Sequence, residues 1–154
     1  MFYVFFISSV SLLQECVEFV GKCWLPARSH VQSALTSLAS VDGSCQIMKL
    51  EVVCPWKEHL YQLEREMGLS KPVLFCLFKD DREGKWRIQA VSTSASSFDN
   101  RRNMPAAWCG LRDAKLSEVS GIPGCVFCHA NGFIGGNDTY EGSLEMARKS
   151  LKMD

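Results

Sequence analysis

An apolar run from Val73 to Phe78 restricts the fold of this chain more than any other segment. Its length and apolarity are typical of a central strand that is buried on both faces. Pro72 precedes the run and a polar turn at residues 80–84 follows it. Residues 86–90 then alternate apolar and polar side chains, as a half-exposed strand does. The two segments therefore predict a β-hairpin within a sheet.

Three amphipathic segments predict helices around that sheet. Residues 25–38 carry an apolar stripe behind a proline in the first turn. Residues 55–68 repeat Trp56, Leu60, Leu63 and Met67 at helical spacing and end at a glycine. The last helix is expected from Thr139 to about Leu151, with the capping-box spacing of Asp138 and Glu141 before it.

Shorter segments complete the expected architecture. Residues 46–53 are a weak strand candidate, residues 113–119 a short helix and residues 125–130 a short buried strand. Residues 92–105 are polar and predict an exposed, mobile loop. The sum is an α/β fold in residues 24–154: a single mixed-sheet domain with flanking helices. Residues 1–23 form a separate, apolar N-terminal segment.

The first 13 residues are uncharged and mostly apolar. A signal peptide would carry a Lys or Arg near its start, and a membrane span would need about 20 apolar residues. Glu15 and Glu18 end the run earlier. We therefore expect no membrane association, and a segment that is either buried or frayed. A truncated or misassembled start and a poorly formed signal peptide are the alternatives.

The charge balance excludes a strongly basic nucleic-acid module. Lys plus Arg and Asp plus Glu both number 17, so the net charge is zero. Lys85-Trp86-Arg87 and Arg101-Arg102 still combine basic and aromatic residues locally, in a way that RNA-binding proteins use. An ordinary solvated face is the competing interpretation.

Eight cysteines are present, and several lie inside apolar runs, where they behave as small buried side chains. The length of the chain argues against a disulfide scaffold and favours reduced thiols in an intracellular setting. Cys125 to His129 spell C-x-x-C-H, the haem-attachment pattern, but no secretory signal accompanies it. A zinc site would have to recruit Cys54 or His59 from elsewhere, so core cysteines are the favoured interpretation.

The glycine-rich segment 131–138 lies between an expected strand and an expected helix. Backbone N–H groups at such a place bind anions, although the spacing matches neither the Walker loop nor the dinucleotide fingerprint. A tight turn with positive φ is the alternative. The three histidines of the chain are scattered, and no Asp-His-His or H-E-x-x-H cluster occurs. The sequence therefore supplies no ligand set for a catalytic metal and no nucleophile elbow.

Six ordered strings of residues carry a resemblance to one family. They are Trp24-Leu25-Pro26-Ala27-Arg28, Cys54-Pro55-Trp56-Lys57-Glu58-His59-Leu60, Lys85-Trp86-Arg87-Ile88-Gln89, Trp108 with Gly110-Leu111-Arg112-Asp113, Ser120-Gly121-Ile122-Pro123-Gly124-Cys125, and Gly132-Phe133-Ile134-Gly135-Gly136 with Glu141-Gly142 and Met146-Ala147. Together they resemble the C-terminal half of the melanocyte proliferating gene exonuclease family, also labelled metal-dependent protein hydrolases, of the DHH phosphoesterase superfamily.

The resemblance implies a two-domain parent that acts as a 3′–5′ RNA exonuclease in the nucleus and the mitochondrion. Its N-terminal domain would hold manganese or magnesium, and its C-terminal domain would bind substrate across the interdomain cleft. On this carry-over the substrate-binding candidates are Gly135, Gly136, His129, Asn137 and Arg112.

The metal-binding half has no counterpart in this sequence, so we expect no catalytic residue, no metal ligand and no activity from the chain alone. A gene-model fragment, a splice product and a true short paralogue are the three origins that fit. RNA is the expected partner, together with a metal-binding domain supplied by a separate chain. The alternative is a non-enzymatic module for RNA, nucleotide or protein that uses an exposed Arg101-Arg102 loop.

Overall fold

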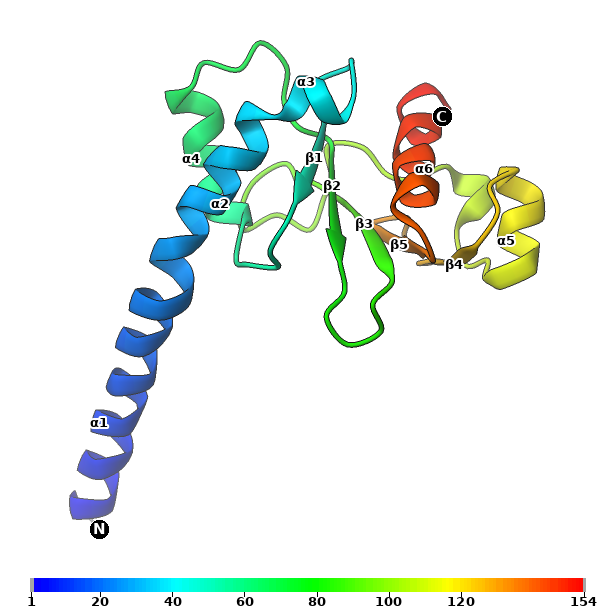
Figure 1. The fold of residues 1–154 in the computed structure, drawn as a ribbon. Helices are drawn as coiled ribbons and strands as arrows, with labels where there is room; N and C mark the ends of the chain where they lie inside the picture. The colour runs from blue at the N-terminus through cyan, green and yellow to red at the C-terminus, as the bar shows by residue number, and fades with distance from the viewer. Residues whose placement is uncertain (1, 154) are drawn as a thin grey trace.

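The computed structural model describes the backbone of residues 2–153 and the side chains of residues 11–153. Helices and strands are interleaved along the chain (Figure 1). In chain order the elements are α1 (Phe2–Phe19), the π-helical turn η1 (Val20–Trp24), α2 (Leu25–Thr36), α3 (Leu38–Val41), β1 (Ile47–Leu50), α4 (Lys57–Glu66), β2 (Phe75–Lys79), β3 (Trp86–Ala90), the 3-10 turn η2 (Ala106–Trp108), α5 (Asp113–Ser120), β4 (Cys125–Cys128), β5 (Ile134–Asn137) and α6 (Tyr140–Lys152).

The strands form one five-stranded sheet in the order β1-β2-β3-β5-β4. β1 and β2 are parallel, and the other neighbouring pairs are antiparallel. The predicted hairpin is confirmed, because Phe75 lies opposite Ala90 and Lys79 opposite Trp86. The structure thereby confirms the predicted α/β class with a single mixed sheet.

The two faces of the sheet have separate hydrophobic clusters. The first cluster joins the sheet to α5 and α6; its strand and helix members include Phe75, Leu77, Ile88, Leu116, Leu144, Met146 and Ala147. The second cluster joins β1 and β2 to α2 and α4; its members include Val31, Leu35, Met48, Leu50, Leu60, Leu63 and Cys76. Because side chains alternate along a strand, adjacent strand residues divide between the two clusters.

The second cluster covers only half of its face. Among the residues that the structure describes, it includes none from β3, β4 or β5. By alternation, Arg87 and Gln89 of β3, Gly136 of β5 and Phe127 of β4 lie on this half. We call it the open half of the sheet, since α2 and α4 do not reach it.

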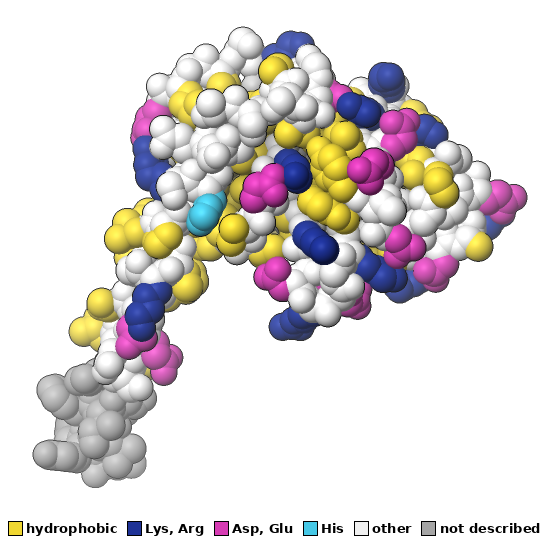
Figure 2. Space-filling view, in the orientation of Figure 1, with side chains coloured by type: hydrophobic (Ala, Val, Ile, Leu, Met, Phe, Trp, Pro, Cys, Tyr) yellow, Lys and Arg dark blue, Asp and Glu magenta, His cyan; other side chains and the backbone are white. Residues whose placement is uncertain are grey.

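The N-terminal segment differs from the expectation. α1, η1 and α2 form one long helix: α2 packs against the sheet, and the α1 part projects away from it (Figure 1). Leu12 and Leu13 are 59% and 65% exposed, so the buried alternative is wrong for these two residues; the side chains of residues 1–10 lie outside the described part. Apolar side chains stand out along this projecting helix in Figure 2. In the described chain, no helix has the length and apolarity to cross a membrane.

The α4 stripe is largely as predicted. Trp56, Leu60 and Leu63 are buried, whereas Met67 is 37% exposed, so the prediction is wrong for this last position. Gly68 ends the helix with φ of 62°, which fits the expected left-handed stop. The α6 cap also differs in detail: Thr139 accepts from the Gly142 N–H at 3.0 Å, in place of the expected Asp138.

The Arg101-Arg102 loop corrects a second expectation. The Arg101 side chain is 15% exposed and donates to both carboxylate oxygens of Glu64, at 2.8 Å each, and to the Val73 carbonyl. Arg102 donates to the Ser150 carbonyl at 2.6 Å. These hydrogen bonds attach the loop to α4 and α6, since Glu64 lies on α4 and Ser150 on α6. The exposed basic loop that the alternative binding module needs is therefore absent from residues 101–102.

Replacing Arg101 by methionine should lower the free energy of unfolding by about 3 kcal/mol, because it leaves the Glu64 carboxylate without its bidentate partner in a nearly closed site. Urea unfolding followed by circular dichroism measures the change. Arg65→Met is the matched control, since Arg65 is exposed on the same helix, and we expect a change within about 0.5 kcal/mol. Equal effects for the two substitutions would contradict the assignment.

Candidate functional site

The glycine pair expected in an anion-binding loop lies in a strand. Ile134 to Asn137 form β5, which pairs with β3 on one side and β4 on the other. Gly135 and Gly136 do not have positive φ, and within segment 131–138 only Gly132 does, at 64°. The expected strand-to-helix loop is therefore wrong for the glycine pair. Two neighbouring strands on either side of this segment supply the hydrogen bonds that make it extended.

The two glycines at the centre of β5 allow close packing on both faces of the sheet. A Cβ atom at Gly135 would lie 3.0 Å from the Phe127 carbonyl oxygen and 3.1 Å from the Met104 sulfur. A Cβ atom at Gly136 would lie 2.8 Å from Nη1 of Arg87 and 3.2 Å from the Phe127 ring. The guanidinium of Arg87 therefore occupies the space directly above Gly136, on the open half of the sheet.

Arg87 is only partly paired in this position. Its Nη2 lies 2.7 Å from Glu83 and 3.2 Å from Asp80, while its Nη1 is buried and has no hydrogen-bond partner among the described residues. Backbone N–H groups of Arg82 and Glu83, and then Arg87 itself, lower the pKa of Asp80. Asp80 thus remains an anion that holds one side of the guanidinium, and the other side is left unsatisfied.

Phe127 connects Arg87 to Arg112. The guanidinium carbons of the two arginines lie 5.3 Å and 5.9 Å from the centre of the Phe127 ring. The Arg112 side chain is 68% exposed and makes only a long ion pair, 4.0 Å, with Asp113. We call Arg87, Arg112, Phe127 and Gly136 the arginine patch. It brings together two of the predicted site residues, Arg112 and Gly136.

Asn137 occupies a different kind of position. Its side chain is fully buried, and its amide donates to the Pro123 carbonyl at 2.9 Å and accepts from the Thr139 N–H at 2.9 Å. A Cβ atom at Gly142 would lie 2.1 Å from the Asn137 amide oxygen, so that residue must be glycine to admit it. Asn137 therefore joins the turn before β4 to the start of α6, and its amide faces the fold.

His129 lies beside a large polar pocket. Its ring is 4.6 Å from the Phe133 ring in an edge contact, and its Nδ1 accepts from the Asn131 backbone N–H at 3.2 Å. The pocket has a volume of about 680 Å³, and its lining includes Phe133 and Gln89 of the open half. We call it the amide pocket; its lining residues are Lys57, Gln89, Ser92, Ser97, Phe98, Asp99, Asn100, Asn103, Asn131 and Phe133.

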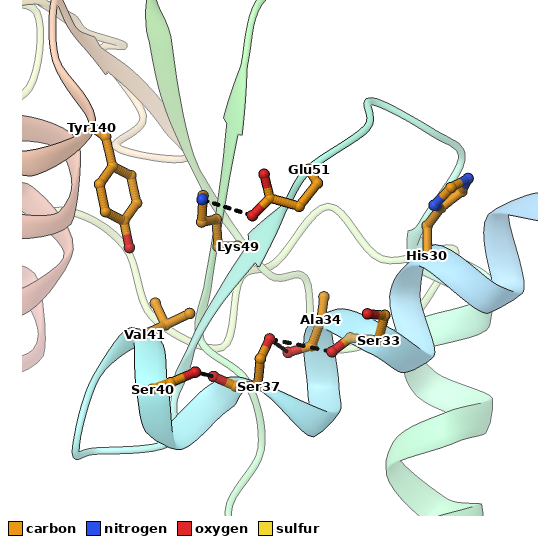
Figure 3. Close-up of a pocket in the computed structure, with 9 residues that line it drawn as sticks. All are labelled: His30, Ser33, Ala34, Ser37, Ser40, Val41, Lys49, Glu51 and Tyr140. Carbon is orange, nitrogen blue, oxygen red and sulfur yellow. Dashed lines mark hydrogen bonds and ion pairs between the residues drawn. The ribbon is translucent and has the colours of Figure 1, made fainter.

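A smaller pocket of about 320 Å³ lies between α2, β1 and α6 (Figure 3). Its single lysine, Lys49, is paired with Glu51 at 2.7 Å and lies 5.0 Å from the Tyr140 ring. The hydroxyls of Ser37 and Ser40 donate to backbone carbonyls of their own helical segment. The lysine and these two serines are thus engaged within the fold.

The cysteine motif lies in the core. Cys125 and Cys128 are 4% and 2% exposed, which confirms the interpretation as small buried side chains. Burial, and secondarily Cys109, raises the pKa of Cys128 to about 12. In the described part of the chain no group of three or more His, Cys, Asp or Glu residues could hold a metal ion. The residues present therefore do not fit a catalytic divalent metal.

Sequence reasoning missed Phe127 and Gln89 as residues of a site, and considered Arg87 only as part of the basic and aromatic string Lys85-Trp86-Arg87. Arg87 and Gln89 lie in a string quoted for the resemblance, but only the sheet register places them on one face with Gly136 and Phe127. The alternation of residues 86–90 was the available signal, since it puts Arg87 and Gln89 on the polar side of that strand.

Comparison with known proteins agrees with the ordered strings. The model of the MYG1 exonuclease family, described as an uncharacterised protein family (UPF0160), matches residues 6–151. This chain belongs to that family. It is 51% identical over 137 residues to the MYG1 exonuclease of Homo sapiens and 49% identical over 135 residues to the MYG1 protein of Dictyostelium discoideum. The Saccharomyces cerevisiae MYG1 protein YER156C is 47% identical over 131 residues.

These matches cover most of this chain and a minor part of each relative. The human, Dictyostelium and yeast alignments include 88%, 88% and 85% of this chain, but only 36%, 41% and 38% of the respective relatives. The chain thus spans about two fifths of the length of these family members. No solved structure was found to match it.

Thiol labelling should separate the cysteines by position. Cys16 and Cys23 are exposed and should react with iodoacetamide within minutes at pH 8, whereas Cys76 and Cys128 should react only on unfolding, because burial raises their pKa. Mass spectrometry of the native, labelled chain measures the modified positions. Rapid labelling of Cys128 in folded protein would contradict its place in the core.

Asn137→Ala should lower the free energy of unfolding by roughly 3 kcal/mol, because it leaves the Pro123 carbonyl and the Thr139 N–H without their partner. Thermal and urea unfolding measure the loss. Asn131→Ala is the matched control, since Asn131 is exposed, and should leave stability within about 0.5 kcal/mol of the parent. A neutral Asn137→Ala variant would show that the amide is dispensable.

Proposed function

We propose that this chain is the substrate-binding part of a metal-dependent 3′–5′ exonuclease that acts on RNA. The observation that carries the proposal is the arginine patch, together with membership of a family in which relatives are named exonucleases. The patch offers the exposed guanidinium of Arg112, on a face without a helical layer, with the nearly buried Arg87 beside it, across the Phe127 ring. A phosphodiester oxygen is the acceptor that such donors bind best.

Gly136 has an indirect part in this proposal. Arg87 can lie flat against the sheet only because Gly136 has no side chain. The glycine pair then supports substrate binding by placing a guanidinium, with Gly135 accommodating the Met104 side chain behind it. His129, exposed at the end of β4, is close enough to Phe133 to border the same face. Asn137 is left out of the contact set, because its amide is engaged within the fold.

The catalytic metal is assigned to another part of the protein. Because the described residues contain no suitable donor cluster, manganese or magnesium would be bound by the part of the relatives that this chain does not cover. We therefore propose that the chain corresponds to the C-terminal part of a DHH phosphoesterase and that it positions RNA for chemistry performed by a metal-binding domain. A nuclear and mitochondrial location is part of the same proposal.

RNA trimming with manganese tests the proposal. The purified chain alone should release no nucleotides from a single-stranded RNA, because its described residues include no group of three or more His, Cys, Asp or Glu that could hold a metal ion. Mixing it with the separately expressed remainder of the Dictyostelium relative should restore trimming, and an Arg112→Gln chain should restore less, since it loses the exposed phosphate-binding guanidinium.

Size-exclusion chromatography of the mixture shows whether the two parts associate. Manganese-dependent trimming by the chain alone, after contamination is excluded with an independently purified Arg112→Gln preparation, would contradict the assignment of the metal elsewhere. An associated mixture that stays inactive with every RNA tested would contradict the substrate-binding assignment.

A further inference from the structure

We propose that the amide pocket binds an RNA base by its edge and its face, next to the phosphate contact at the arginine patch. This inference rests on the proposed function, since it assigns the place of a base within the same substrate. Its separate observations are two carboxamides, of Gln89 and Asn131, that make no hydrogen bond within the described residues, and the exposed aromatic ring of the pocket.

The pocket presents carboxamides that the fold does not use. The side chains of Gln89 and Asn131 make no hydrogen bond among the residues that the structure describes, while Asn100 donates to Asn103 at 2.6 Å. A carboxamide has both donors and an acceptor on one planar edge, which matches the polar edge of a base. Single-stranded RNA offers such edges, because its bases are not paired.

Aromatic side chains accompany these amides. The Phe98 side chain is fully exposed to solvent, at 101%. Phe133 is half-buried and lines the pocket together with Gln89. An apolar ring held in water has an unfavourable free energy, which a base stacked on it relieves. The pocket volume of about 680 Å³ is within the range of sites that bind small molecules.

The charges of the pocket favour a base over a phosphate. Lys57 lines it from one element and Asp99 from another, so a cation and an anion both border the same space. A carboxylate beside the ligand disfavours a phosphate there. At the exposed end of the arginine patch, by contrast, the Arg112 side chain is 68% exposed and makes only a 4.0 Å ion pair with the Asp113 carboxylate. The two regions thus divide the binding of one nucleotide between them.

Their arrangement on the sheet supports this division. Arg87 and Gln89 lie two residues apart on the same side of β3, and their partners in β5 are Gly136 and Ile134. Two residues along a strand span about 7 Å, close to the separation of a phosphate from the base that it carries. A nucleotide lying along β3 would therefore contact the arginine patch and the amide pocket together.

Fluorescence anisotropy of a labelled RNA hexamer, and of an abasic ribose-phosphate hexamer of equal length, tests the inference on the full chain. We expect Phe98→Ala to lower the affinity for the RNA hexamer about tenfold and to leave the affinity for the abasic hexamer unchanged, because the substitution removes only stacking. Asn131→Ala should act in the same direction. Phe19→Ala is the matched control, since Phe19 is exposed on α1, outside the pocket. Arg112→Gln should lower the affinity for both hexamers.

An RNA affinity that is unchanged in Phe98→Ala, or equal affinities for the two hexamers, would overturn the base pocket while leaving the phosphate contact in place. Adenosine, which has no phosphate, tests whether the pocket binds a base when the phosphate contact fails. NMR shifts at the Gln89 and Asn131 side-chain amides on adding adenosine would support the pocket even if neither hexamer binds. That combination would contradict the proposed RNA function and leave the base pocket in place. Absence of binding by all three probes would overturn both proposals.

Discussion

The glycine pair in strand β5, Gly135 and Gly136, is the constraint on which the rest of this structure depends. It lies inside the sheet between β3 and β4, where most proteins place large β-branched residues. Its two glycines let Met104 approach from one face and the Arg87 guanidinium from the other. The buried amide of Asn137 then ends the strand and fixes the start of α6. Core packing, helix position and the arginine patch thus follow from the same four residues.

This strand also shows where sequence reasoning reached its limit. The apolar run at residues 73–78 and the alternation at residues 86–90 report burial directly, so the hairpin could be predicted. Two successive glycines carry no such signal, since glycine is common in turns and rare in strands. Only the neighbouring strands, which supply hydrogen bonds on both sides, decide that the segment is extended.

The partner of Arg101 was hidden for a related reason. Glu64 lies 37 residues away on α4, and nothing in the local pattern around Arg101-Arg102 distinguishes a solvated pair from a paired one. The same holds for the site. Arg112 is the N-cap residue of α5, Phe127 lies in β4 and Arg87 lies in β3. These residues become neighbours only through the strand order of the sheet. The family strings indicated that these segments matter, and the fold gives the physical reason.

We propose that RNA binds across the open half of the sheet. Two-dimensional NMR of the isotope-labelled chain, titrated with an RNA hexamer, tests it most directly. We expect shifts at Arg87, Gln89, Phe127 and Phe133, with little change at Lys49 and Tyr140 in the smaller pocket. Shifts confined to that smaller pocket, or to the helices of the second cluster, would contradict it.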